Sequence, residues 1–427
     1  VTSAQTLTFN SAISGTATGV GAVFSGAGTT VLGSGSLGGS GANTYAGSTI
    51  LNSGALTAAR PPGVTSIPGD LTVVSGTLTL SNAEQIADAA RVVINNLNAT
   101  GTLALSLNET ISALTLNSTT AGAGVSGTGP LVLTSTGTAL TVTGGTIASQ
   151  IRLTGSSGGG ITFAAPSTVL APSLAANAGV ATGPYTTTIS GAVDLNASGT
   201  PLTRTVTVGD GPGMIDLNLS GALTASGART GILKVGAGTM RIGAASTYTG
   251  LTTVDGGVLS FNTAGALGLG GLTVNSGTAQ FDTAGAPNTL PTTVPTLAPV
   301  VVTMNGGMLE FNNLNATLGK LVYNGGTINL PTSGVLTIQN LSNNADILVL
   351  DGTSNPLALR GSINLGNALV TNNVVTPSSS TTTVTVDGAL NLSNQGPRNF
   401  VIGDGSAAVD LDIIASISKT VALVRCG

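Results

Sequence analysis

The feature that most constrains the fold of this chain is a short turn-and-strand unit that occurs twice. Residues 236–259 read GAGTMRIGAASTYTGLTTVDGGVL, in which three short apolar runs are separated by turns of Gly, Ser, Thr and Asp. The runs are too short for a helix and rich in Val, Leu, Ile and Thr, so they predict strands joined by tight turns. An earlier copy passes through Gly26–Thr29, Asn43–Gly47 and Asn52–Leu56. Two copies of one pattern indicate a repeat architecture.

The chain also repeats over a longer distance. Leu107–Ile111 resembles Leu314–Leu318, and Thr203–Gly211 resembles Pro397–Gly405, in the same order and about two hundred residues apart. The sequence therefore predicts one continuous β-solenoid over residues 1–427. Its long repeats cover about 5–211 and 212–405, and a third begins at 406–427. The copies differ by segments of roughly twenty residues, about one solenoid turn, which such a fold can gain or lose because each turn contacts only its neighbours.

Composition supports this all-β fold and argues against several classes of protein. Glycine contributes 63 of 427 residues, charged residues are 7%, and His and Trp are absent. The hydrophobic fraction of 41% lies in strand-length pieces, which argues against disorder, and no apolar run is long enough for a membrane-spanning helix. A net charge of −4 without a basic cluster argues against a nucleic-acid partner. The single cysteine, Cys426, excludes an intramolecular disulfide framework.

Within the solenoid, Val, Leu, Ile and Phe are expected to point inwards, and Thr, Ser and Asn to lie on outward faces and in turns. At most one short helix is expected, at Ser81–Arg91, because Ser81 and Glu84 have the spacing of a capping box. Pro287–Pro299 and Ser378–Thr383 are expected to be loops that extend from the stack.

The unit at 236–259 resembles the passenger-associated repeat of autotransporter proteins. That repeat has a Gly-x-Gly-Thr strand, an Asn/Ser-Thr-Tyr-x-Gly turn and a strand that ends in Gly-x-Leu. Asn43–Gly47 and Ser246–Gly250 match the turn. The resemblance implies an elongated, right-handed parallel β-helix on the outside of a bacterial cell.

No residue pattern in the sequence points to a catalytic or metal centre. Without histidine, neither a Ser-His-Asp triad nor a histidine-based metal site can be built. Gly209–Gly211 and Gly403–Gly405 each hold an Asp, but calcium requires several carboxylates together, so tight turns are the preferred interpretation. We expect no cofactor and no catalysis. Tyr45 and Tyr248 are expected to be packing residues, with carbohydrate stacking as the alternative.

The strand patterns near the two ends of the sequence are similar, and a terminal solenoid turn exposes apolar side chains and an unpaired strand edge. We therefore predict end-to-end continuation of the β-helix, within a longer covalent array or between separate chains that form a filament. The residues assigned to this self-association are Leu7, Phe9, Ile13, Val409, Leu411, Ile413 and Ile417.

The sequence thus predicts a non-catalytic, extracellular structural element of a bacterial cell surface or matrix, which acts as a rigid spacer or fibre. Its expected partners are copies of itself, with a carbohydrate or cell-surface ligand as a further possibility. One alternative is an adhesin that binds a host or carbohydrate ligand through loops such as Pro287–Pro299. The less favoured alternative is a polysaccharide-cleaving β-helix enzyme, because the chain's few Lys and Glu residues are scattered along the sequence.

Overall fold

The structure is a computed structural model of the chain, which forms two compact units, Val1–Thr230 and Gly231–Gly427. We call these the N-terminal unit and the C-terminal unit. The loop expected at Pro287–Pro299 and residues 378–382 of the loop expected at Ser378–Thr383 lie outside the described residues. The structure describes residues 5–16, 19, 21–33, 41–96, 101–118, 124–135, 138–142, 146–147, 151–153, 160–163, 187–196, 201–211, 214–226, 228–263, 265–282, 300–312, 316–329, 335–338, 345–350, 357–365, 372–377, 383–392, 398–414, 416–418 and 424–426.

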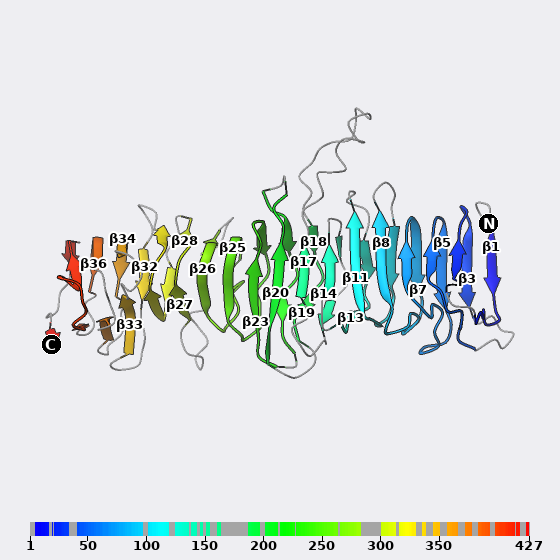
Figure 1. Cartoon of the computed structure of the whole chain (residues 1–427), viewed down its shortest axis with the longest axis horizontal. Coiled ribbons are helices and arrows are strands. Elements are labelled where there is room, and N and C mark those ends of the chain that lie inside the picture. The colour runs from blue at the N-terminus through cyan, green and yellow to red at the C-terminus, as the bar shows by residue number, and fades with distance from the viewer. Residues whose placement is uncertain are drawn as a thin grey trace, which may run out of the picture. The chain divides into compact units, whose positions relative to one another are not determined.

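In the N-terminal unit, parallel strands from successive turns stack into three sheets (Figure 1). The first sheet contains β2 (Ala22–Phe24), β4 (Thr49–Leu51), β6 (Leu71–Val73), β8 (Arg91–Asn96), β11 (Ala113–Ser118), β14 (Thr138–Val142), β17 (Gly160–Phe163) and β20 (Leu202–Val208). The second contains β1 (Thr6–Phe9), β3 (Thr29–Gly33), β5 (Ala55–Ala59), β7 (Gly76–Leu80), β9 (Gly101–Leu105), β12 (Gly124–Gly127), β15 (Thr146–Ile147), β18 (Thr187–Ile189) and β21 (Leu217–Leu219). The third contains β10 (Glu109–Ile111), β13 (Leu131–Leu133), β16 (Ile151–Leu153), β19 (Val193–Asp194) and β22 (Leu223–Thr224).

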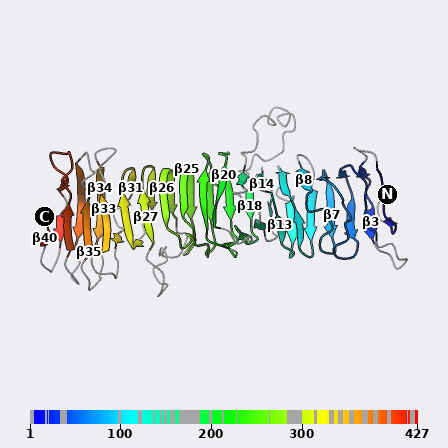
Figure 2. The same cartoon turned by 60° about the horizontal axis from the view of Figure 1, so that its bottom comes forward.

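The C-terminal unit is built in the same way, with parallel strands that repeat from turn to turn (Figure 2). Its strands are β23 (Thr230–Val235), β24 (Thr239–Ile242), β25 (Thr252–Phe261), β26 (Leu272–Phe281), β27 (Val301–Met304), β28 (Met308–Phe311), β29 (Ala316–Leu318), β30 (Lys320–Tyr323), β31 (Thr327–Asn329), β32 (Val335–Ile338), β33 (Ala345–Leu350), β34 (Leu357–Asn364), β35 (Asn372–Thr376), β36 (Val384–Asn391), β37 (Arg398–Ile402), β38 (Leu411–Ile413), β39 (Ser416–Ser418) and β40 (Val424–Cys426). Each unit is thus a parallel β-solenoid, as the sequence predicts. The long repeats over 5–211 and 212–405, and the start of a third at 406–427, stay predictions.

The core of each unit consists of inward side chains stacked from one turn to the next. In the N-terminal unit, Leu80 aligns with Leu105 in the next turn, and both side chains are buried. In the C-terminal unit, the rings of Phe261, Phe281 and Phe311 stack with centroids 4.9 and 5.3 Å apart. This alternation of buried and outward positions follows from the two-residue period of a strand.

Glycine is required at one corner of the solenoid by both conformation and space. Gly54 has a φ of +84°, and a Cβ atom there would lie 2.1 Å from the carbonyl oxygen of Gly26 in the preceding turn. In the C-terminal unit, Gly277 has a φ of +73°, and its Cβ would lie 2.5 Å from the carbonyl oxygen of Gly257. An L-residue would be strained and would collide with the neighbouring main chain. The glycine turns in the sequence therefore mark the corners where turns approach most closely.

The helix expected at Ser81–Arg91 is wrong, because this segment forms turns that bond to neighbouring solenoid turns. The main-chain N–H of Ser81 donates to Ala58, and the side chain of Asn82 donates to the carbonyl oxygen of Arg60. Glu84 has a φ of +54°, which is incompatible with a right-handed helix. The described residues contain no helix, and therefore none that could cross a membrane.

Candidate functional site

The two copies of the Thr-Tyr-x-Gly turn form the same internal contact. Tyr45 and Tyr248 are buried, and their hydroxyl groups hydrogen-bond the hydroxyls of Thr49 and Thr252 at 2.5 and 2.7 Å. Burial raises the pKa of both tyrosines. A Cβ atom on Gly268 would lie 2.5 Å from the ring of Tyr248, so the following turn needs glycine there. Both tyrosines are packing residues, as expected from the sequence, and their rings are not available to stack on a ligand.

A buried lysine holds the Gly-x-Gly corner of the second copy. Lys234 is fully buried, and its ammonium group donates to the carbonyl oxygens of Gly236, Gly238 and Gly256 at 2.8, 2.7 and 2.9 Å. The first two oxygens belong to its own turn and the third to the next one. Carbonyl dipoles that converge on a cation replace part of its lost hydration. Lys234 therefore joins two successive turns and is not presented to solvent.

A column of buried polar side chains follows one corner of the N-terminal unit. Arg60 is fully buried and donates through its guanidinium group to Asn43 Oδ1 at 2.7 Å. In the following turns, Gln85 Oε1 accepts from the main-chain N–H of Arg60 at 3.0 Å and from the hydroxyl of Ser66 at 2.8 Å. The amide of Asn43 donates to the carbonyl oxygen of Ser66 at 2.6 Å. These side chains bond main chain and side chains of successive turns, which gives them a structural role.

The column ends at Glu109, which is also fully buried. Its carboxyl group accepts the main-chain N–H groups of Gln85 and Ile86 at 2.8 and 2.7 Å. Desolvation raises the pKa of Glu109 to about 8, the two hydrogen bonds oppose this rise, and the charges of Glu84 and Asp88 add to it. In the next turn the same position is Leu131, which can accept no such bond.

Two buried arginines lie at matching positions of the long repeat. Arg204 Nε donates to the carbonyl oxygen of Leu195 at 2.7 Å, and Arg398 Nε donates to the carbonyl oxygen of Leu365 at 2.8 Å. Burial lowers the pKa of both guanidinium groups, and for Arg204 the charge of Asp194 opposes this change. Like Lys234, these arginines donate hydrogen bonds to main-chain carbonyl oxygens.

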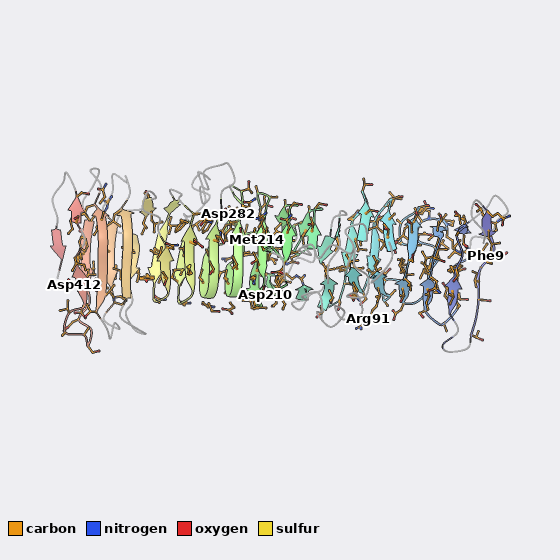
Figure 3. The ribbon with its side chains drawn as sticks, turned by 90° about the horizontal axis from the view of Figure 1, so that it is seen from above. Phe9, Arg91, Asp210, Met214, Asp282 and Asp412 are labelled. Carbon is orange, nitrogen blue, oxygen red and sulfur yellow. The ribbon has the colours of Figure 1, made fainter. Side chains whose placement is uncertain are left out.

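The Gly-Asp-Gly segments lie outside the strands, and their interpretation as tight turns stays a prediction. The main-chain N–H of Gly211 donates to Asp216 at 2.7 Å, and that of Gly405 donates to Asp410 at 3.0 Å. Asp210 itself is exposed on the N-terminal unit (Figure 3). Among the residues that the structure describes, no group of three or more His, Cys, Asp or Glu could hold a metal ion.

The predicted self-association residues of the N-terminal unit lie on and just after β1. Phe9 on β1 (labelled in Figure 3) aligns with Leu32 of β3, an inward and fully buried residue, yet Phe9 is only half-buried. Leu7 lies in the same inward register and is 46% exposed. The main-chain N–H of Ile13 donates to Asn43 Oδ1 at 2.8 Å.

Among the predicted residues of the C-terminal unit, Leu411 and Ile413 lie on β38 with Asp412 (labelled in Figure 3), Ile417 lies on β39, and Val409 precedes β38. Leu411 and Ile413 align with inward residues of β36 and are half-buried. Ile417 aligns with the buried Leu390 and is 46% exposed, and Val409 is also exposed. Each of the seven residues is therefore half-buried or exposed. The contact itself stays a prediction.

Comparison with known proteins agrees with the resemblance seen in the sequence. Residues 25–58 and 232–261 match the family model of the passenger-associated-transport-repeat. One match lies in each unit, and each contains the buried tyrosine described above. No curated protein and no solved structure matches the chain.

Proposed function

We propose, from two passenger-associated-transport repeats built into a parallel β-solenoid, that this chain is an extracellular structural element of a bacterial cell surface. It would serve as a spacer or fibre-forming segment and would not act as a catalyst. The repeat belongs to a class of secreted passenger segments, which supports the location. The solenoid supports the structural role, because stacked turns hold one another through main-chain bonds along their whole length.

The observation that carries the structural role is the use of charged side chains inside the solenoid. Among the described residues, four basic and three acidic side chains are buried. The contacts described above direct most of them to main-chain groups of the same or neighbouring turns. A catalytic or binding site would require charged groups that converge on a solvent-accessible point. The buried charged residues are Arg60, Glu109, Asp194, Arg204, Asp216, Lys234 and Arg398.

We further propose that the inward columns continue beyond β1 and beyond β39 onto another solenoid turn. That turn is supplied either by further residues of the same polypeptide or by a second copy. The support is that Leu7 and Ile417 occupy inward positions and are nevertheless 46% exposed, whereas the inward residues next to them are buried. Covering apolar surface of this kind is favourable by roughly 25 cal/mol per Å².

Location is tested by adding protease to intact cells of the producing bacterium. Degradation of the chain without loss of a cytoplasmic marker supports the proposal, and full protection of the chain contradicts it. The structural role is tested by electron microscopy of the purified chain together with a cell-adhesion assay. Fibres without adhesion support the structural role, whereas adhesion by chains that form no fibre supports the adhesin alternative.

The end-to-end contact is tested by comparing lysine substitutions at inward positions with lysine substitutions at outward positions of the same terminal regions. Leu7→Lys and Ile417→Lys place a charge in the inward columns and are expected to abolish assembly. Val23 and Ile414 are exposed by 62% and 61% but lie in outward positions, so Val23→Lys and Ile414→Lys serve as matched controls. Equal loss of assembly in all four variants would contradict the proposed contact.

A further inference from the structure

The outward face of the C-terminal unit carries a line of polar side chains, one from each of four successive turns. Arg241 on β24 aligns with Ser260 on β25, Ser260 with Gln280 on β26, and Gln280 with Glu310 on β28. We call these four residues the outer polar column. Adjacent strands lie about 4.8 Å apart, so Arg241 and Glu310 are separated by roughly 14 Å along the column. A cation occupies one end and an anion the other.

The column contains polar atoms that the described residues leave without a partner. Ser260 is only 5% exposed, and its hydroxyl oxygen is buried without a hydrogen bond. The Nε atom of Arg241 is also buried without a hydrogen bond. Glu310 accepts one bond at Oε1 from the amide of Asn329, at 3.3 Å. The chain itself covers the two unpartnered atoms, so the parts of the column that another molecule can reach are the half-buried side chains of Arg241, Gln280 and Glu310.

The equivalent positions of the first repeat show that the solenoid does not require such a column. Val31 and Thr57 occupy the places of Arg241 and Ser260 in the sequence pattern of the repeat, and Thr79 and Ala104 follow them in register. The first repeat therefore carries an uncharged column on the same framework. The charges of the outer polar column are an addition to the fold.

A second column beside the first supplies side chains that carry methyl groups. Thr239, Val258, Thr278 and Met308 align across the same four strands and are all half-buried. The face thus combines a polar column and a partly apolar column on one parallel sheet. Two such faces can pack against each other about 10 Å apart, as sheets do in β-sandwiches.

We propose that this face pairs with the same face of a second copy of the chain, with the two solenoid axes antiparallel. A two-fold axis that passes between β25 and β26, along the strands, places Arg241 of each copy opposite Glu310 of the other. The same axis places Ser260 opposite Gln280, so that two uncharged polar residues face each other between the two ion pairs. The column is therefore complementary in charge to a second copy of itself that runs in the opposite direction, and an isologous contact requires such self-complementarity.

The pairing is lateral, and it is independent of the end-to-end contact proposed above. The patch is small compared with the roughly 800 Å² per partner that a stable interface buries, so one contact is weak. Its ion pairs would be screened by salt. Where several copies of the chain lie side by side, repeated contacts would add through avidity.

Cross-linking in solution tests the contact, because it captures weak complexes. In a Cys426→Ser background, the Ser260→Cys and Gln280→Cys chains are mixed and treated with a short bismaleimide. Facing sheets hold opposite thiols too far apart for a disulfide but within reach of such a reagent. The matched control is a mixture of Thr57→Cys and Thr79→Cys, which lie in the uncharged column of the first repeat. We expect a cross-linked dimer from the first mixture well above the control.

Charge reversal then tests the antiparallel register. Arg241→Glu makes the column acidic at both ends, and Glu310→Arg makes it basic at both ends. Introduced into both cysteine chains, either substitution is expected to reduce cross-linking about fivefold. Mixing an Arg241→Glu chain with a Glu310→Arg chain is expected to restore it, and so is the double reversal in both chains. Circular dichroism verifies that every variant is folded.

Two results would overturn the proposal. The first is cross-linking no greater than in the control mixture. The second is a failure of the acidic and basic chains to restore cross-linking when mixed, because their columns carry opposite charges at both ends. A column that served a soluble polysaccharide in place of a second copy would give the first result.

Discussion

Glu109 should make the stability of the N-terminal unit depend on pH in a range where no other side chain of this chain normally titrates. Its carboxyl group is fully buried, and desolvation raises its pKa from 4.5 to about 8. Because the folded state holds this proton more tightly than the unfolded state does, folding is favoured at low pH. Stability is present in full below about pH 4.5 and is lost as the pH rises through the window to about 8. The chain has no histidine, so no other side chain has an ordinary pKa in this interval.

The magnitude follows from the width of the window. Within it, the free energy of unfolding should fall by about 1.4 kcal/mol for each pH unit, or on the order of 4–5 kcal/mol over the whole range. The assay is guanidinium denaturation followed by circular dichroism at several pH values between about 4 and 9, repeated with the Glu109→Gln variant. The variant carries no titrating group at this position, so its curve should be flat across the window.

The two curves should also cross. The N–H groups of Gln85 and Ile86 bond different oxygens of Glu109, and glutamine has one side-chain oxygen in place of two. Glu109→Gln should therefore be less stable than the natural chain at low pH by about 1–3 kcal/mol. At high pH the natural chain carries a buried carboxylate and should become the less stable of the two. A natural chain whose stability is constant or rises between about pH 5 and 8 would refute this reasoning.

Three further predictions concern the packing of the second repeat. Leu259→Ala, in a fully buried inward position, should lower the free energy of unfolding by about 2–5 kcal/mol. Arg241→Ala, on the outward face, should change it by no more than about 0.5 kcal/mol in thermal denaturation. The reverse order would show that the inward and outward assignment is wrong. Gly268→Ala should cost about 1–3 kcal/mol, because the new methyl would lie 2.5 Å from the ring of Tyr248, and an unchanged unfolding midpoint would contradict that contact. Lys234→Met keeps the length of the side chain but removes the ammonium donors from three carbonyl oxygens. The free energy of unfolding in denaturant titration should therefore fall by about 1–3 kcal/mol. An unchanged free energy of unfolding would show that solvent can satisfy these oxygens.

The fold could be predicted from the sequence because its determinants are local. Short apolar runs of period two define the strands, and glycines mark the corners, as Gly54 and Gly277 show. The packing role of Tyr45 and Tyr248 was also predicted, since both lie in a turn that recurs in the sequence.

The burial of Arg60 and Glu109 could not be predicted, because their partners are distant in the sequence. Arg60 donates to the carbonyl oxygen of Ser11, 49 residues earlier, and Glu109 accepts from residues of the preceding turn. Nothing near either residue in the chain indicates that it is buried. The helix expected at Ser81–Arg91 was wrong for the same reason, since bonds to neighbouring turns outweighed a local capping pattern.

The outer polar column was also missed by sequence reasoning. The four residues of the column are 19 to 30 positions apart from one turn to the next. Aligning the two repeats turn by turn would have revealed the contrast with Val31 and Thr57. Such an alignment requires the register of the strands, which the sequence alone does not provide.

The glycine corners have a consequence for how a chain of this kind can evolve. A point substitution at Gly54 or Gly277 meets both a forbidden backbone angle and a neighbouring carbonyl, so single mutations there are eliminated. Duplication or deletion of a whole turn preserves every such corner. Outward positions such as Arg241 are free of this constraint. Change in such a chain is therefore expected to proceed in two ways, by recombination in units of one turn and by rapid divergence of its outward surface.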